Sequence, residues 1–239
     1  MIRLALFISG GATTACAVIN ACRKNLLKIN PVMVVASKKG ISGIDRINKL
    51  GFPKQNIIIV NPLSYKNADS FADKLLSECF KKKVELIGQY GWLPLTPKKF
   101  IKEFEGRIVN QHPGPLDQNG LDFGGKGMYG RRVHAAVIYF RRKTGHDYWT
   151  EATSHLVNEE FDRGQVIGRI KINIAADDTV ETLAQKVLPV EHNLQIEVLQ
   201  KFAQNKVKIL NRKKSLIQKK ERRVLNQSKK IAAYLYPHG

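Results

Sequence analysis

The strongest constraint on the fold of this chain is the alternation of short β-branched runs with segments of helical apolar spacing along its first hundred residues. Runs at 4–8, 32–36, 57–60 and 84–87 are typical of buried strands. Helical spacing follows in a segment through Ala17, Val18, Ala21 and Cys22, and again over 41–50 and 70–82. Because strands that alternate with helices favour crossover connections, we predict an α/β fold. Its sheet should be mostly parallel, with helices on both faces.

The pattern changes after residue 106. We expect a strand at Ile108-Val109, a helix over 131–136, strands over 137–140 and 154–157, an amphipathic helix over 178–202, an edge strand over 207–210 and a helix in the basic segment beyond Arg212. Residues 113–130 form an 18-residue stretch that contains six glycines. A loop of this length inside a compact domain is usually functional or disordered, so it is a candidate part of a binding site.

Length, composition and charge set the domain organisation. The chain has 239 residues, 43% of them hydrophobic, which is enough for a sizeable core. Its formal charge is +20, of which residues 201–239 carry +11 with Glu221 as their one acid. We predict one domain over 1–210 and a basic, helical extension over 211–239. The excess charge favours phosphate- or carboxylate-bearing partners. For the tail, an RNA contact and a solvated basic helix both remain open.

Cysteine usage and the length of apolar runs indicate the compartment. Cys16, Cys22 and Cys79 include no CxxC pair and cannot all pair with one another, so neither a disulfide framework nor a zinc site is predicted. The apolar run at the N-terminus is too short for a signal peptide, and no segment approaches membrane-spanning length. We expect a cytoplasmic protein with no membrane contact and no bound metal.

Asn110 and His112 are the first candidates for chemistry. They follow Ile108-Val109 two residues apart, so they project from the same side of a strand's C-terminal end. Ligands bind at that edge of open parallel sheets. Pro113 cannot continue the strand pairing, so the chain leaves the sheet there. The alternative is a turn with a structural histidine.

A second cluster follows the strand expected at 154–157. The sequence Asn158-Glu159-Glu160-Phe161-Asp162-Arg163-Gly164 forms an acidic turn, which taken alone fits an ordinary Asx turn. A carboxylate beside His112 would favour the imidazolium form, and an imidazolium next to a carboxamide can stabilise a developing oxyanion.

Together these motifs resemble those of the folate-dependent formyltransferase family over residues 1–205. The resemblance includes Ser9-Gly10, Ser37-Lys38-Lys39, Gly91-Trp92-Leu93, Gly106-Arg107, Asn110-Gln111-His112-Pro113, His155 through Gly164, and Glu191-His192. It is greatest to the members of purine biosynthesis that formylate phosphoribosylglycinamide. It implies a Rossmann-like formyltransferase fold and 10-formyltetrahydrofolate as co-substrate.

The resemblance also implies a role for each matching residue. Asn110 would bind the formyl oxygen, His112 would stabilise the tetrahedral intermediate, and Asp162 would keep this histidine charged and assist proton transfer. The acceptor's phosphate would bind at a helix start formed by Gly10, Gly11, Ala12, Thr13 and Thr14. The folate would contact Trp92, Leu93, Pro94, Val157 and Asn158. His155 matches a position next to the site, for which a structural role is equally compatible.

Two departures from the family pattern concern the acceptor. Members that bind a phosphorylated glycinamide carry a Ser-Gly-Asn-Gly-Ser-Asn-like loop, which here is Ser9-Gly10-Gly11-Ala12-Thr13-Thr14. The interval from Asn110 to Asp162 is also longer than expected for such members, with the excess over 117–126 and 141–149, and this extra length could remake the amine pocket. The exact acceptor therefore stays open.

Other functions remain compatible with these motifs. Methionyl-tRNA formyltransferase shares the catalytic domain, but the tail is too short for its usual β-barrel RNA-binding domain. A formyltransferase for another amine is possible, and a formyltetrahydrofolate hydrolase would be expected to carry an N-terminal regulatory domain. An RNA-binding protein on an inactive transferase scaffold is disfavoured by the intact Asn110, His112 and Asp162 and by the lack of aromatic RNA-binding signatures.

Overall fold

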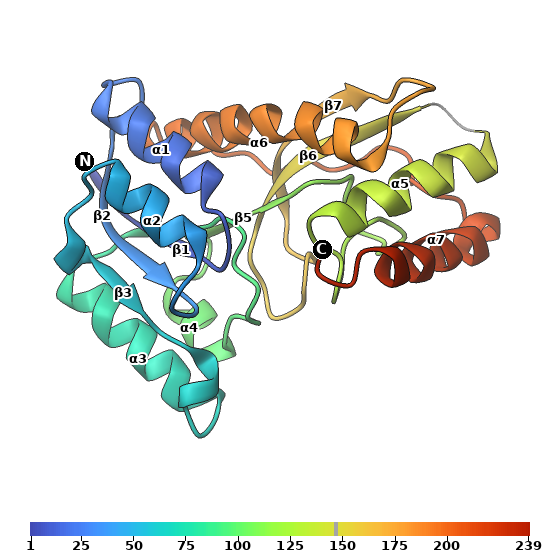
Figure 1. The fold of residues 1–239 in the computed structure, drawn as a ribbon. Helices are drawn as coiled ribbons and strands as arrows, with labels where there is room; N and C mark the ends of the chain where they lie inside the picture. The colour runs from blue at the N-terminus through green and yellow to red at the C-terminus, as the bar shows by residue number, and fades with distance from the viewer. Residues whose placement is uncertain (146–147) are drawn as a thin grey trace. The chain divides into compact units, whose positions relative to one another are not determined.

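The computed structural model describes residues 1–145 and 148–239 (Figure 1). Within these ranges the strands are β1 (Ile2–Ile8), β2 (Ile29–Ala36), β3 (Ile57–Ile59), β4 (Leu86–Gln89), β5 (Ile108–His112), β6 (Trp149–Leu156) and β7 (Val166–Asn173). The α-helices are α1 (Thr13–Arg23), α2 (Ser42–Lys49), α3 (Ala68–Lys81), α4 (Lys98–Glu103), α5 (Arg131–Thr144), α6 (Val180–Ala203) and α7 (Arg222–Leu235). Short 3-10 turns lie at Lys54–Asn56, Pro62–Ser64 and Lys219–Glu221.

The strands form one sheet in the order β3-β2-β1-β4-β5-β6-β7. Pairing is parallel between β1 and β2, β1 and β4, β2 and β3, and β4 and β5, and antiparallel between β6 and β7. The predicted α/β class with a mostly parallel sheet is confirmed. Because the order reverses between β1 and β4, the carboxyl ends of these two strands mark the switch point where ligands bind in such sheets.

The chain divides into two compact units. Unit 1 consists of Met1–Gln111, Leu156–Glu159 and Gln195–Val207, and unit 2 of His112–His155, Glu160–Leu194 and Lys208–Gly239. The expected domain boundary at residue 210 stays a prediction.

The core of unit 1 lies on both faces of its parallel strands. Leu4 through Ile8 in β1 are completely buried, which explains why the sequence shows a continuous apolar run there instead of alternation. Ala5 and Phe7 pack in a cluster with Phe71 of α3 and Phe100 of α4. The alternating residues of β1 are buried on the opposite face.

In unit 2, residues 137–140 form part of α5, so the strand predicted there is wrong. The buried residues Val133, Ala136, Val137 and Phe140 follow helical spacing, and the helix ends at Gly145 with a left-handed φ of 67°. The β-branched pair Val137-Ile138 suggested a strand, but burial along one helix face outweighs that weak propensity.

Two further differences concern the edge next to β6. Strand β7, which was not predicted, pairs with β6 from Trp149↔Asn173 to His155↔Val166. The edge strand predicted over 207–210 is wrong, because that segment has no strand structure. The Leu210 N–H of this segment donates to the Val166 carbonyl at 2.8 Å. A paired strand would need a series of such hydrogen bonds along the edge of the sheet. No helix in the described ranges is long and apolar enough to cross a membrane.

Candidate active site

The turn between β1 and α1 presents backbone amides at a helix start. Ala12 precedes the helix with a left-handed backbone (φ 55°, ψ 26°), and no side-chain cap is found there among the described residues. Arg46 of α2 donates from Nη1 to the Gly11 carbonyl at 2.9 Å. Thr14 is buried, and its Oγ1 has no hydrogen-bond partner in the part of the chain that the structure describes. The predicted phosphate site therefore has free amides and an adjacent guanidinium.

Ser9 connects this turn to the loops that follow β2 and β4. Its N–H donates to Gly91 O at 3.1 Å, and its Oγ accepts from Leu93 N at 3.0 Å and from Ser37 Oγ at 2.8 Å. Ser9 and Ser37 are both buried. Neither serine was predicted to have a role. A signal was present, because each hydroxyl follows directly on a strand of a parallel sheet.

The predicted folate residues all belong to unit 1. Trp92 is buried against Phe7, with ring centroids 5.0 Å apart, and Val157 packs against the same core cluster. Leu93 is 47% exposed. Pro94 and Asn158 are half-buried. The Trp92 ring is thus a core group, which leaves Leu93 and the loop backbone as the surfaces available to a ligand.

Asn110 lies near the carboxyl end of β5. Its Cα pairs in register with Gln89 of β4, and its side chain is half-buried. This residue belongs to unit 1, as do the phosphate turn and the folate residues.

His112, Asp162 and His155 meet in unit 2, although they are far apart in sequence. Asp162 Oδ2 lies 3.5 Å from His112 Nδ1, and Asp162 Oδ1 lies 3.5 Å from His155 Nε2. All three side chains are nearly inaccessible to solvent. Since His112 Nε2 also lies 3.1 Å from the Phe123 carbonyl, both ring nitrogens of His112 face an acceptor. That arrangement can accommodate an imidazolium.

The electrostatics of this cluster differ in one respect from the expectation. Burial lowers the pKa of His112 below its ordinary value, although the negative charge of Asp162 opposes the shift. We expected Asp162 to keep the ring charged, but desolvation outweighs the effect of the carboxylate on the pKa of His112. Burial alone would raise the pKa of Asp162, yet interactions with His112, His155 and the Gly125 N–H lower it well below its usual range.

A further histidine, His134 of α5, is buried close to the cluster. Burial lowers its pKa to about 4, and the charge of His112 contributes in the same direction. It is therefore neutral at physiological pH. Among the described residues, no group of three or more His, Cys, Asp or Glu side chains could hold a metal ion.

The order of the strands and the ligand-competent edge at β1 and β4 define a doubly wound α/β protein. Residues 2–199 match the family model described as formyl transferase. The chain belongs to the formyl transferase family and is a formyltransferase.

Named relatives agree with this assignment. The chain is 31% identical to the chloroplastic phosphoribosylglycinamide formyltransferase of Arabidopsis thaliana over 92% of this chain and 71% of that protein. It is 30% identical to the protein of the same name from Vigna unguiculata over 86% of this chain and 62% of that protein. Its fold is similar to that of glycinamide ribonucleotide transformylase 1 from Symbiobacterium toebii, with a TM-score of 0.75, 24% identity, and coverage of 88% of this chain and 95% of that chain.

Proposed function

We propose that this formyltransferase moves the formyl group of 10-formyltetrahydrofolate to the amine of phosphoribosylglycinamide. The observation that carries the proposal is the position of the Asp162 carboxylate between the buried imidazoles of His112 and His155. Strand β5, which ends at His112, also contains Asn110. The plant relatives named for the same acceptor support the choice of substrate.

The reaction determines what the site must supply. The acceptor amine attacks the formyl carbon, a C–N bond forms, and the carbonyl oxygen becomes an alkoxide while the nitrogen becomes an ammonium. Loss of a proton from this nitrogen and collapse of the alkoxide break the bond to N10 of the folate, which leaves with a proton. The site therefore needs hydrogen-bond donors for the oxygen and an acceptor for the ammonium proton.

We assign these tasks to three residues. The Asn110 carboxamide donates to the developing alkoxide, the positive charge of the His112 imidazolium stabilises it, and Asp162 takes up the proton directly or through water. A negative charge that develops beside His112 offsets the cost of desolvating the charged ring. The pKa of His112 therefore rises as the intermediate forms. Asp162 then stabilises the positive charge of the His112 ring while the intermediate forms.

The phosphate of the acceptor would bind at the start of α1. Uncapped amides of a helix N-terminus favour an anion, and the Arg46 guanidinium beside the Gly11 carbonyl adds a positive charge. This arrangement uses backbone groups, so the proposal does not depend on the asparagine that the resembling loops carry.

A purified-protein assay with 10-formyltetrahydrofolate and a set of acceptor amines tests the proposal. Formylation of phosphoribosylglycinamide is the expected outcome. Transfer to methionyl-tRNA alone, or to a different small amine alone, would replace the proposed acceptor, and hydrolysis without transfer would replace the reaction.

A further inference from the structure

The C-terminal segment 208–239 belongs to unit 2, as do His112 and Asp162. Helix α7 lies alongside α5 (Figure 1) and buries Leu225, Ser228 and Ala232. Lys229 comes four residues after Leu225 and three before Ala232, so it shares their inward face, whereas Lys230 is exposed. One lysine of this basic helix is thus directed into the protein.

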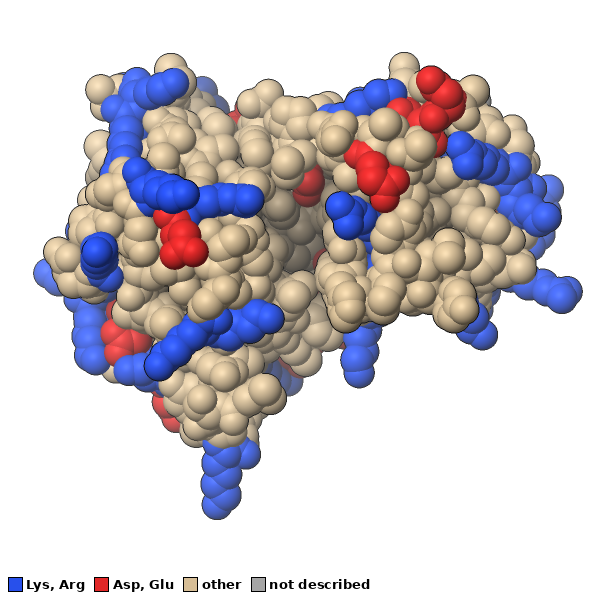
Figure 2. Space-filling view, viewed as in Figure 1, with Lys and Arg blue, Asp and Glu red and all other residues tan. Residues whose placement is uncertain are grey.

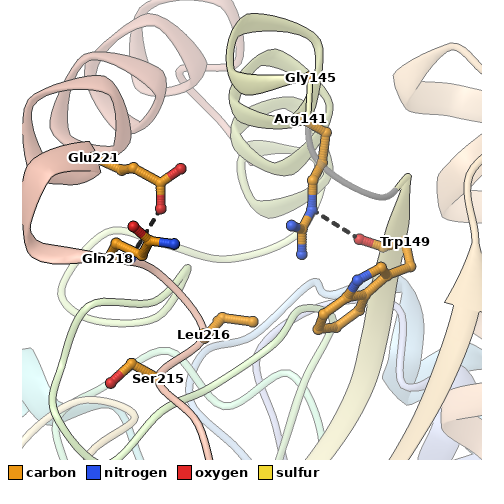
Figure 3. A pocket seen from close by; sticks show the side chains of 7 residues that line it. All are labelled: Arg141, Gly145, Trp149, Ser215, Leu216, Gln218 and Glu221. Carbon is orange, nitrogen blue, oxygen red and sulfur yellow. Dashed lines mark hydrogen bonds between the residues drawn. The ribbon is translucent and has the colours of Figure 1, made fainter.

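The approach to α7 faces α5 and β6 across a pocket (Figure 3). The pocket has a volume of about 350 Å³. Figure 3 shows the residues of all three segments that line it. Arg141 of α5 donates from Nε to the Trp149 carbonyl at 3.3 Å, and its guanidinium lies 4.5 Å from the centroid of the Trp149 ring. In the turn that leads into α7, Gln218 N donates to Glu221 Oε2 at 2.9 Å. The turn that begins α7 is thus closed by a hydrogen bond of its own.

The same segment contacts the glycine-rich loop before α7 begins. Arg212 donates from Nε to the Leu116 carbonyl at 2.9 Å, and Leu216 N donates to Asp117 Oδ2 at 2.6 Å. These contacts join residues almost a hundred positions apart in sequence. They place the extension against the loop that follows His112.

Lys229 reaches the end of this loop and meets a peptide group that also contacts Asp162. Its Nζ donates to the Gly124 carbonyl at 2.7 Å, and the N–H of the next residue, Gly125, donates to Asp162 Oδ2 at 2.9 Å. The carbonyl and the N–H belong to one planar peptide unit, in which they point in opposite directions. A single rigid group thus connects the ammonium of Lys229 to the carboxylate oxygen that faces His112.

The backbone conformation of Asp162 is uncommon. Its φ is 57°, in the left-handed region that non-glycine residues seldom occupy. Gly124 packs so closely that a Cβ there would lie 2.8 Å from Asp162 Cβ and 2.5 Å from a methyl of Leu116. The position of the carboxylate therefore depends on the exact path of the loop at 124–125.

We propose that Lys229 is a positioning residue for Asp162, acting through the peptide between Gly124 and Gly125, so that the C-terminal extension forms part of the catalytic machinery. The inference rests on the proposed function of Asp162 and His112. An ammonium on the carbonyl polarises the peptide and strengthens its N–H as a donor to the carboxylate.

The charges around Lys229 are consistent with this role. Burial lowers its pKa, while the carboxylates of Asp122 and Asp162 oppose the shift and Arg163 adds to it. Asp122 is itself paired with Arg163 at 2.7 Å. Removing the positive charge of Lys229 should therefore make both Asp162 and His112 easier to protonate.

The test compares K229M, K229Q and K229R with K230M, which removes an exposed charge from the same helix. We expect K229M to lower kcat about tenfold with little change in either KM, because the carboxylate loses a charge-assisted contact but the binding surfaces remain. The pKa of His112, followed by NMR of its ring through a pH titration, should rise in K229M and K229Q. K229R should restore both readouts in part, and K230M should match the wild type.

Two results would overturn the proposal: a folded K229M with wild-type kcat and His112 titration, or equal effects in K230M. If K229M does not fold, K229Q decides, because it can keep a donor to Gly124 while it loses the charge. The NMR titration also separates the two proposals. If the wild type formylated none of the acceptors, the proposed function would fail, but a raised His112 pKa in K229Q would still support the role of Lys229.

Discussion

The Asp162 carboxylate interacts with two imidazoles, and its position relative to His112 carries the proposed chemistry at the scale of single residues. We predict that His112→Ala and Asp162→Asn each lower turnover by at least about 10²-fold, because each removes a group that stabilises charge in the transition state. Folate binding should stay largely intact. Steady-state kinetics with 10-formyltetrahydrofolate measure the first effect, and a direct folate-binding titration measures the second. Asp177→Asn, which removes an exposed carboxylate, is the matched control.

The protonation of His112 gives a prediction that does not need turnover. Burial lowers its pKa and Asp162 opposes the shift, so the ring of the unliganded wild type should titrate below its ordinary value of about 6.5. Asp162→Asn removes the opposing negative charge, and the pKa should fall further. An NMR pH titration of the ring measures both. A titration at or above the ordinary value would mean that the carboxylate, and not burial, dominates.

At the scale of elements, the start of α1 is the proposed phosphate site. Gly11→Asp should raise the acceptor KM with little effect on folate binding, because a carboxylate would repel the phosphate and compete for Arg46. A Cβ at position 11 would lie 2.7 Å from Arg46 Nη1, the end of a flexible side chain that can move. Gly11→Asn provides similar bulk without charge. Equal acceptor KM values in the wild type and Gly11→Asp would place the phosphate elsewhere.

Helix α6 contains a buried acid that should make stability depend on pH. Burial raises the pKa of Glu191 to about 8, and its Oε1 has no hydrogen-bond partner among the described residues. The unfolded value is near 4.3, so between these two values the folded chain holds a proton that the unfolded chain releases. The stabilisation is complete below the unfolded pKa and is lost as pH rises to about 8.

Glu191→Gln should therefore gain stability relative to the wild type as pH increases, by about 4 kcal/mol between pH 4.5 and 8.5. The free energy of unfolding from urea titrations at both pH values measures this difference. Glu197→Gln, at an exposed position of the same helix, should show no comparable trend. A constant difference between Glu191→Gln and the wild type would show that Glu191 is ionised in the folded state.

The elements also show what the sequence could and could not predict. Strands β1 to β4 and helices α1 to α3 could be predicted because each has its own apolar period, whereas the short helix α4 was not predicted. The strand prediction at Val137-Ile138 was wrong because the burial of this pair depends on neighbours distant in sequence. Strand β7 was not predicted. His112 and Asp162 could be found from motifs. Lys229 could not, because its role depends on a fold that brings residue 229 to the Gly124 carbonyl.

The whole chain carries a net charge of +20. Basic side chains are spread over the face shown in Figure 2, and acidic ones are few. In the extension, Lys229 and Arg212 make internal contacts, whereas Lys219, Lys220, Arg222 and Arg223 line an open surface pocket. The internal and the surface charges can therefore be tested separately.

The last prediction concerns the acceptor. Deletion of residues 212–239 should lower stability or solubility, and turnover with it because Lys229 is lost, but leave phosphoribosylglycinamide as the acceptor. Neutralising only Lys219, Lys220, Arg222 and Arg223 to Gln should change neither turnover nor acceptor.

A small phosphorylated amine meets one anion site, so its KM should rise only weakly with salt, whereas a tRNA held by many phosphate contacts would bind with a steep salt dependence. Assays of all three proteins with both acceptors over a range of salt concentrations measure these effects. If the intact protein formylated methionyl-tRNA, ignored phosphoribosylglycinamide, and lost that activity in the neutralised variant, the basic surface would be an RNA-binding site and the proposed acceptor would be wrong.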